Sequence, residues 1–206
     1  MHTTIVSTCL SKINLLLSLL LLSTLPVLAQ NGTYERNATK GAYGVISFQK
    51  TGNLVKAEIF TWWNSSNSQT GSYFGQGTLK NDFVYLKSDE NEPECKVTLH
   101  LVQGKIKATF SKCSTDHLTE DFNGTYTKIS DAVAGDYQVI ASKAYFYKAA
   151  NTASKLKAYV VQGDKVTLDM QNMAANTGNW VFVSYMNKAD KETTGFMPLS
   201  ALKRIN

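Results

Sequence analysis

The C-terminal part of the sequence decides the fold class. Residues 142–202 read SKAYFYKAANTASKLKAYVVQGDKVTLDMQNMAANTGNWVFVSYMNKADKETTGFMPLSAL. Short apolar segments recur in this stretch, separated by clusters of turn-forming residues: AYFY, KAYVV, KVTLDM, WVFVSYM and GFMPL. Segments of strand length at this spacing are typical of a small all-β barrel.

Three motifs in this stretch resemble the bacterial SH3-like domain family. Residues 157–166 (KAYVVQGDKV) are similar to that family's strand, glycine turn and strand, and residues 178–183 (GNWVFV) to its G-x-W-x-x-V strand. Residues 193–197 (TTGFM) resemble its closing turn, with Phe196 in the place of the usual Trp. The resemblance implies a small β-barrel over residues 135–206. It also implies a domain that binds peptides or cell-wall polymers and performs no chemistry.

Aromatic residues of this region are the candidate ligand-binding residues. Tyr145 and Tyr147 alternate with Phe146, so we expect the two tyrosines on one face of a strand and Phe146 on the other. The remaining candidates fall on neighbouring strands or turns: Tyr159, Trp180, Tyr185 and Phe196. Rings with a polar tip suit extended peptides and sugars. The alternative is that these rings fill the core, with Trp180 and Phe146 as the first candidates for that role.

Residues 1–29 are predicted to be a signal peptide. Lys12 precedes a mostly apolar segment at residues 13–22, and Val27-Leu28-Ala29 fits a small-residue cleavage site before Gln30. The apolar segment is shorter than the roughly 20 residues of a membrane-spanning helix. We therefore expect an exported mature chain, periplasmic or extracellular, without an integral membrane span. An uncleaved N-terminal anchor is the alternative.

Cys95 and Cys113 are the only cysteines that follow residue 29, and in an exported chain they predict one disulfide bond. Residues 95–113 are predicted to form a β-hairpin that turns at Gln103-Gly104. This register makes every inward pair apolar, namely Leu101 with Ile106, Leu99 with Ala108, and Val97 with Phe110. It places Cys95 one step from Cys113, and a small bulge would bring the sulfurs together. His100 and Lys107 then point to solvent.

Residues 30–128 are predicted to form one antiparallel β module. Within residues 54–63, Val55, Ala57 and Ile59 alternate with the polar Lys56 and Glu58, and a tight turn at Gly52 joins this strand to one at residues 43–50. The polar residues 31–40 predict a loose entry segment or an edge strand. Residues 70–79 are rich in glycine, but neither a Lys-Ser/Thr pair nor a helix pattern follows them. A bent or closely packed strand therefore fits them better than a phosphate-binding loop.

A second resemblance concerns this first module. The cysteine-linked hairpin is followed by an F-x-G-x-Y-x-K motif at residues 122–128. Together they resemble secreted bacterial β modules that are similar to lysozyme inhibitors. No functional residue is carried over from that resemblance. The alternative function is the inhibition of an envelope-degrading hydrolase by this module. Such an inhibitor would need an exposed loop that enters an active site, and residues 89–94 and 114–120 are the candidates.

The sequence predicts neither catalysis nor a cofactor. His100 and His117 lie outside any metal-ligand spacing, and the two cysteines are better used as a bridge. Asp169 alternates with apolar neighbours, so it is expected to face water, and no G-x-S-x-G motif is present. The formal net charge is +5, but the lysines are scattered, which does not favour a nucleic-acid partner. We expect no catalytic residue, no metal and no cofactor; an enzyme is the third alternative.

These observations predict an all-β protein of two modules, residues 30–128 and 135–206, joined by a short linker at residues 129–134. The expected function is non-catalytic binding of a cell-envelope ligand, either a peptidoglycan peptide or a partner protein.

Overall fold

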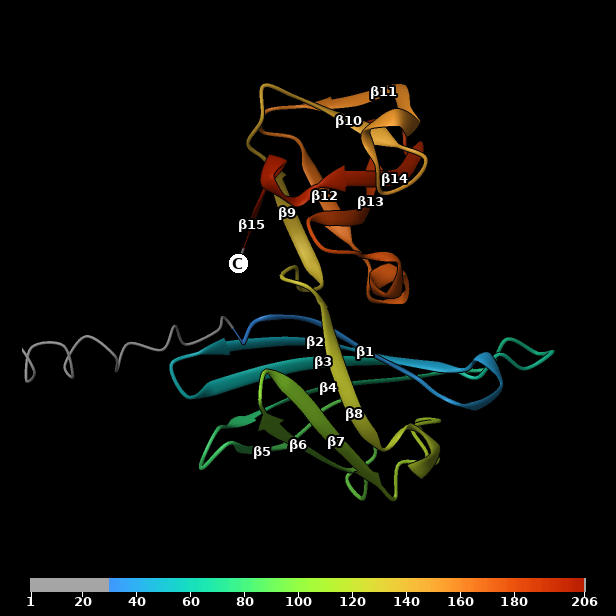
Figure 1. Cartoon of the computed structure of the whole chain (residues 1–206), viewed down its shortest axis with the longest axis vertical. Coiled ribbons are helices and arrows are strands. Elements are labelled where there is room, and N and C mark those ends of the chain that lie inside the picture. Colours follow the sequence, from blue (N-terminus) through green and yellow to red (C-terminus); the bar gives the residue numbers. More distant parts are fainter. Residues whose placement is uncertain (1–29, 206) are drawn as a thin grey trace, which may run out of the picture.

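The structure of the protein, a computed structural model, describes residues 30–205. These residues form fifteen β-strands and five short 3-10 helices (Figure 1). The predicted all-β, antiparallel fold class is therefore confirmed. The predicted signal peptide at residues 1–29 lies outside the described residues. Within residues 30–205, no helix has both the length and the apolar character needed to cross a lipid bilayer.

The first sheet contains eight strands in the order β4-β3-β2-β1-β8-β7-β6-β5. Gln76 and Lys87 join its two ends, because the backbone N–H of each donates to the carbonyl oxygen of the other, at 2.9 and 2.8 Å. The sheet is therefore a nearly closed barrel. Its strands are β1 (Gly32–Asn37), β2 (Tyr43–Thr51), β3 (Leu54–Trp62), β4 (Thr70–Thr78), β5 (Phe83–Leu86), β6 (Lys96–Val102), β7 (Lys105–Ser111) and β8 (Gly124–Ser130).

Glycines in β4 allow the close approach that this closure requires. A Cβ on Gly77 would collide with the carbonyl oxygen of Tyr85 in β5. A Cβ on Gly75 would lie 3.0 Å from the carbonyl oxygen of Lys87. The glycine-rich stretch is thus a closely packed strand, as the sequence predicted.

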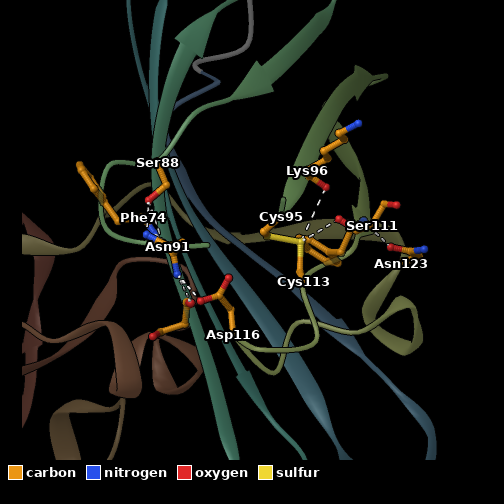
Figure 2. Close-up of a disulfide and its surroundings, with 11 residues drawn as sticks. Phe74, Ser88, Asn91, Cys95, Lys96, Ser111, Cys113, Asp116 and Asn123 are labelled. Atoms are coloured by element: carbon orange, nitrogen blue, oxygen red, sulfur yellow. Dashed lines mark hydrogen bonds between the residues drawn. A yellow bond between two sulfur atoms is a disulfide. The ribbon is translucent and has the colours of Figure 1, made fainter. Parts of the chain in front are cut away.

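The hairpin of β6 and β7 has the predicted register. Leu101 lies opposite Ile106. Leu99 lies opposite Ala108, and Val97 lies opposite Phe110, as predicted. Cys95 and Cys113 form the predicted disulfide bond, with their Cα atoms 4.3 Å apart (Figure 2). Lys112 has a φ of 58°, and this left-handed residue turns Cys113 toward Cys95 at the open end of the hairpin. Both cysteines are buried in the barrel core.

The prediction for residues 31–40 was wrong. β1 is neither a loose segment nor an edge strand, because it lies between β2 and β8 in the barrel. Tyr34 points into the barrel core and its hydroxyl donates to the carbonyl oxygen of Gln30 at 2.7 Å. Thr33 is fully buried on the other face, where its hydroxyl donates to the carbonyl oxygen of Ala132 at 2.7 Å. Hydrogen bonds to the polar tips thus allow a polar sequence to form an interior strand.

The second sheet contains seven strands in the order β11-β10-β14-β13-β12-β9-β15. Its core contains apolar residues from most of these strands and from the 3-10 helix at Met170–Ala175. Phe146, Met173 and Met197 are each at most 1% exposed. Its strands are β9 (Gly135–Val139), β10 (Lys143–Tyr147), β11 (Lys155–Val161), β12 (Lys165–Leu168), β13 (Trp180–Met186), β14 (Glu192–Pro198) and β15 (Leu202–Arg204). The 3-10 helices are η1 (Thr39–Gly41), η2 (Glu120–Phe122), η3 (Thr152–Ser154), η4 (Met170–Ala175) and η5 (Leu199–Ala201).

The chain passes from the first sheet to the second through residues 131–134, which connect β8 to β9 (Figure 1). Ala132, Val133 and Ala134 are buried. Val45, on the outer face of β2, packs in the core of the second sheet, so the first sheet contributes to the second core. The independent folding of residues 135–206 stays a prediction.

Candidate functional site

Aromatic side chains gather on the outer face of the second sheet. Phe182 lies directly opposite Phe196 across β13 and β14, and Phe196 lies opposite Tyr147 across β14 and β10. Tyr145 lies opposite Tyr159 across β10 and β11. Residues opposite one another in an antiparallel pair point to the same face. We call the resulting set the aromatic surface; its members are Tyr145, Tyr147, Tyr159, Trp180, Phe182 and Phe196.

Contacts between the rings hold the aromatic surface in a defined shape. Tyr147 and Trp180 meet edge to face, with ring centroids 4.9 Å apart, and Phe182 and Phe196 do the same at 5.3 Å. These geometries are the favoured ones for aromatic pairs. Tyr159 is 50% exposed, and the other members are half-buried. The rings therefore form a surface accessible to a ligand.

Two lysines lie over the tyrosines of this surface. The Lys155 ammonium is 3.5 Å from the ring centroid of Tyr145, and the Lys143 ammonium is 3.7 Å from that of Tyr159. Hydrogen bonding to Lys143 lowers the pKa of the Tyr145 hydroxyl, and the positive charges of Lys143 and Lys155 act in the same direction. This end of the aromatic surface is thus both aromatic and basic, a combination that favours ligands with acidic groups.

The structure separates Tyr185 from the other predicted site residues. Val181 and Val183 are fully buried. Tyr185 lies on the same face of β13 as these two valines and packs against the second core. Trp180 and Phe182 lie on the opposite side of the same strand. Sequence analysis did not include Phe182, although its alternation with Trp180 was a usable signal. Phe146 is 1% exposed and belongs to the core, whereas Trp180 is half-buried on the outer face.

Strand β11 forms one edge of the second sheet, beside the aromatic surface. It pairs with β10 on one side, and its other side has no paired strand within residues 30–205. Leu156 is 38% exposed and Val161 45% exposed. An edge of this kind can add an extended peptide as a further strand.

The titratable residues considered for chemistry have structural partners. His100 stacks on Phe83 with ring centroids 3.8 Å apart, and the Nδ1 atom of His117 lies 2.8 Å from the side-chain nitrogen of Gln69. Asp169 is exposed, as expected, and accepts a hydrogen bond from Ser184. Residues 30–205 contain no group of three or more His, Cys, Asp or Glu side chains that could hold a metal ion.

Hydrogen bonds of Asn91 hold the acidic loop at residues 89–94 in a defined shape. The side-chain oxygen of Asn91 accepts hydrogen bonds from the backbone N–H of Phe74 at 3.1 Å and from the hydroxyl of Ser88 at 2.9 Å (Figure 2). The side-chain nitrogen of Asn91 donates to Asp116 at 2.9 Å. Asp89, Glu90 and Glu92 are exposed on this loop.

Comparisons with protein-family models, curated proteins and solved structures return no match for this chain. The likeness to SH3-like domains and to lysozyme-inhibitor-like modules therefore rests on the sequence motifs alone.

Proposed function

We propose that this protein is an exported, non-catalytic binding protein that recognises a cell-envelope ligand with the aromatic surface. The observation that carries this proposal is the geometry of that surface. Rings from β10, β11, β13 and β14 lie on one face, partly exposed, and fix one another by ring contacts. Rings that are already ordered lose little conformational freedom on binding.

The ligand proposed is an extended chain with acidic groups, either a peptidoglycan peptide or a segment of a partner protein. Lys143 and Lys155 favour carboxylates at the tyrosine end of the surface. The free side of β11 offers backbone hydrogen bonds to an extended chain. The signal-peptide pattern and the SH3-like motifs support an envelope location, periplasmic or extracellular.

The test is co-sedimentation of the purified protein with purified peptidoglycan. The double variant Tyr145→Ala, Tyr159→Ala should lose about thirtyfold or more in binding, because hot-spot aromatic residues each contribute about 1 kcal/mol or more. Tyr85→Ala is the matched control, since Tyr85 is 70% exposed on β5 of the first sheet. It should bind like the unmodified protein.

Sedimentation no greater than that of the denatured protein would reject the peptidoglycan ligand. Equal binding by all variants would reject the aromatic surface. If peptidoglycan fails, an envelope protein that cross-links to the unmodified protein but not to the double variant identifies the partner-protein form of the proposal.

A second candidate function is inhibition of an envelope-degrading hydrolase by the acidic loop. The observation that favours it is the bracing of this loop by Asn91, because a loop that enters an active site must hold its shape. A lysozyme activity assay with the purified protein tests it. The variant Asp89→Asn, Glu92→Gln should then lose inhibition while the tyrosine double variant keeps it. No inhibition by the unmodified protein would reject this candidate.

A further inference from the structure

A cleft of about 430 Å³ lies where the first sheet meets the last strand of the second. Its floor is the outer face of β2, β3 and β4, where cross-strand neighbours stand in rows. Ser47, Glu58 and Phe74 form one row, and Gln49 and Lys56 form the next. Arg204 of β15 lines the same cleft from the second sheet.

Arg204 lines this cleft with a half-buried side chain. One terminal nitrogen, Nη2, donates to the carbonyl oxygen of Ala134 at 3.2 Å. The Nε atom is buried and has no hydrogen-bond partner within residues 30–205. This Nε is shielded from the cleft, so a ligand would be contacted by the accessible part of the guanidinium. Guanidinium groups pair well with carboxylates.

The charged residues that line the cleft indicate the net charge of the ligand. Arg204 and Lys56 are cationic and Glu58 is acidic, so the lining carries one net positive charge when all three are ionised. Among the described residues, Arg204 and Glu58 form no ion pair. Burial raises the pKa of Glu58, and the nearby Arg204 opposes that shift. A monoanion matches this balance, whereas Glu58 would repel a dianion more strongly than a monoanion.

The rim of the cleft is apolar. Leu54 is 45% exposed and Phe74 is 37% exposed, and both line the cleft. Phe74 and Lys56 also line a smaller depression that reaches Glu90 on the acidic loop. A ligand with an apolar substituent next to its charged group would cover these side chains.

We propose that this cleft binds a small monocarboxylate with an apolar substituent. Arg204 and Lys56 contact the carboxylate, and Leu54 and Phe74 contact the apolar substituent. The cleft is separate from the aromatic surface, because β10 and β11 lie at the end of the second sheet remote from the barrel (Figure 1). The proposal therefore stands independently of the function proposed above.

The test is an NMR titration of the ¹⁵N-labelled protein with N-acetylleucine, with its neutral amide N-acetylleucinamide, and with inorganic phosphate. N-acetylleucine should shift the backbone amide signals of Ser47, Lys56 and Glu58. Its affinity should exceed that of the neutral amide about tenfold, as expected when one charge-assisted contact is lost. Phosphate should bind more weakly than N-acetylleucine, because of Glu58.

Two variants should change the affinity for N-acetylleucine in opposite directions. Lys56→Gln should weaken N-acetylleucine binding several-fold, and Glu58→Gln should strengthen it, because the repulsion is removed. Lys203→Gln is the matched control, since Lys203 is an exposed neighbour of Arg204 on β15 that does not line the cleft. It should leave the affinity unchanged.

Several results would overturn the proposal. These are the absence of shifts at Ser47, Lys56 and Glu58, equal affinity for the carboxylate and the amide, and tighter binding of phosphate. A loss with Lys203→Gln as large as that with Lys56→Gln would also overturn it, because it would indicate attraction by general positive charge. Arg204→Lys should weaken N-acetylleucine binding while the dispersed signals of its spectrum show that the fold is retained; unchanged affinity in this folded variant would also overturn the proposal.

Discussion

The side-chain oxygen of Ser47 accepts a hydrogen bond from the backbone N–H of Ala134 at 2.8 Å, and both residues are buried. This contact ties the outer face of β2 to the segment that connects the two sheets. The inner face of β2 lies in the barrel core through Ile46 and Phe48, while Val45 packs in the second core. One strand therefore contributes to both cores.

Replacing Ser47 with Ala should destabilise the protein by about 1–3 kcal/mol, because it leaves the buried N–H of Ala134 without an acceptor. Urea unfolding measures the change. Ser72→Ala is the matched control, since Ser72 is exposed on β4, and it should change the stability by less than about 0.5 kcal/mol. Equal losses in the two variants would show that this hydrogen bond does not stabilise the contact between the sheets.

Reducing the disulfide bond should cost about 3 kcal/mol. Cys95 and Cys113 are 18 residues apart, and a cross-link that closes a loop of this length restricts the unfolded chain by about that amount. Urea unfolding with and without a reductant gives the difference. A thiol titration of the protein lacking residues 1–29 should find no free thiol. Two reactive thiols in protein recovered from the cell exterior would contradict the pairing.

Substitutions along β10 should alternate in their effect on stability. Phe146→Ala should cost about 3–5 kcal/mol, since Phe146 is 1% exposed and its removal opens a cavity in a small core. Tyr145→Ala should cost much less, and Tyr147→Ala should fall between them because the Tyr147 ring packs against Trp180. Thermal unfolding of the three variants measures this order. A large loss with Tyr145→Ala would mean that the outer face of β10 is covered in solution.

Stability should fall in acid partly through Asp136. Hydrogen bonds from Lys165 and from Thr167 hold the pKa of the Asp136 carboxyl below its ordinary value. A lowered pKa in the folded state stabilises the protein above the unfolded-state pKa of about 3.9, and this stability is lost as the pH falls through the folded-state pKa. Asp136 and Lys165 are 40% and 60% exposed, so the effect should be at most about 1 kcal/mol.

Urea unfolding of Asp136→Asn from about pH 5 to about pH 2 measures this contribution. The variant should lose less stability over this range than the unmodified protein does. Asp190→Asn is the control, because Asp190 is exposed and forms no ion pair within the described chain. Its pH dependence should match that of the unmodified protein. The same pH dependence in Asp136→Asn would contradict the assignment.

Local patterns in the sequence predicted the hairpins well. The register of β6 and β7 followed from three apolar pairs, and alternation along β10 placed Phe146 in the core. Both inferences need only neighbours within one strand or one hairpin. The same reasoning failed for β1, because the hydroxyl of Thr33 donates to the carbonyl oxygen of Ala132, a residue far away in the sequence that no local pattern reveals.

The candidate sites were predicted less completely. Alternate residues of a strand share a face, so Phe182 could have been predicted to lie on the same face as Trp180. By the same rule, Tyr185 could have been predicted to lie on the opposite face, which packs against the core. The cleft was beyond local reasoning. It requires Arg204, from the last strand, to lie beside Lys56 and Glu58 of β3, and nothing in the sequence near any of them indicates that contact.

The glycines of β4 limit how this sequence can diverge. Gly71, Gly75 and Gly77 each face backbone atoms that any larger residue would displace, whereas exposed residues between them such as Ser72 and Gln76 are free of that restriction. Distant relatives with the same barrel should therefore retain the spacing G-x-x-x-G-x-G ahead of a short strand, even where the aromatic and charged residues have changed. That spacing, together with the two cysteines, is therefore the pattern by which a distant relative with this barrel should be recognised.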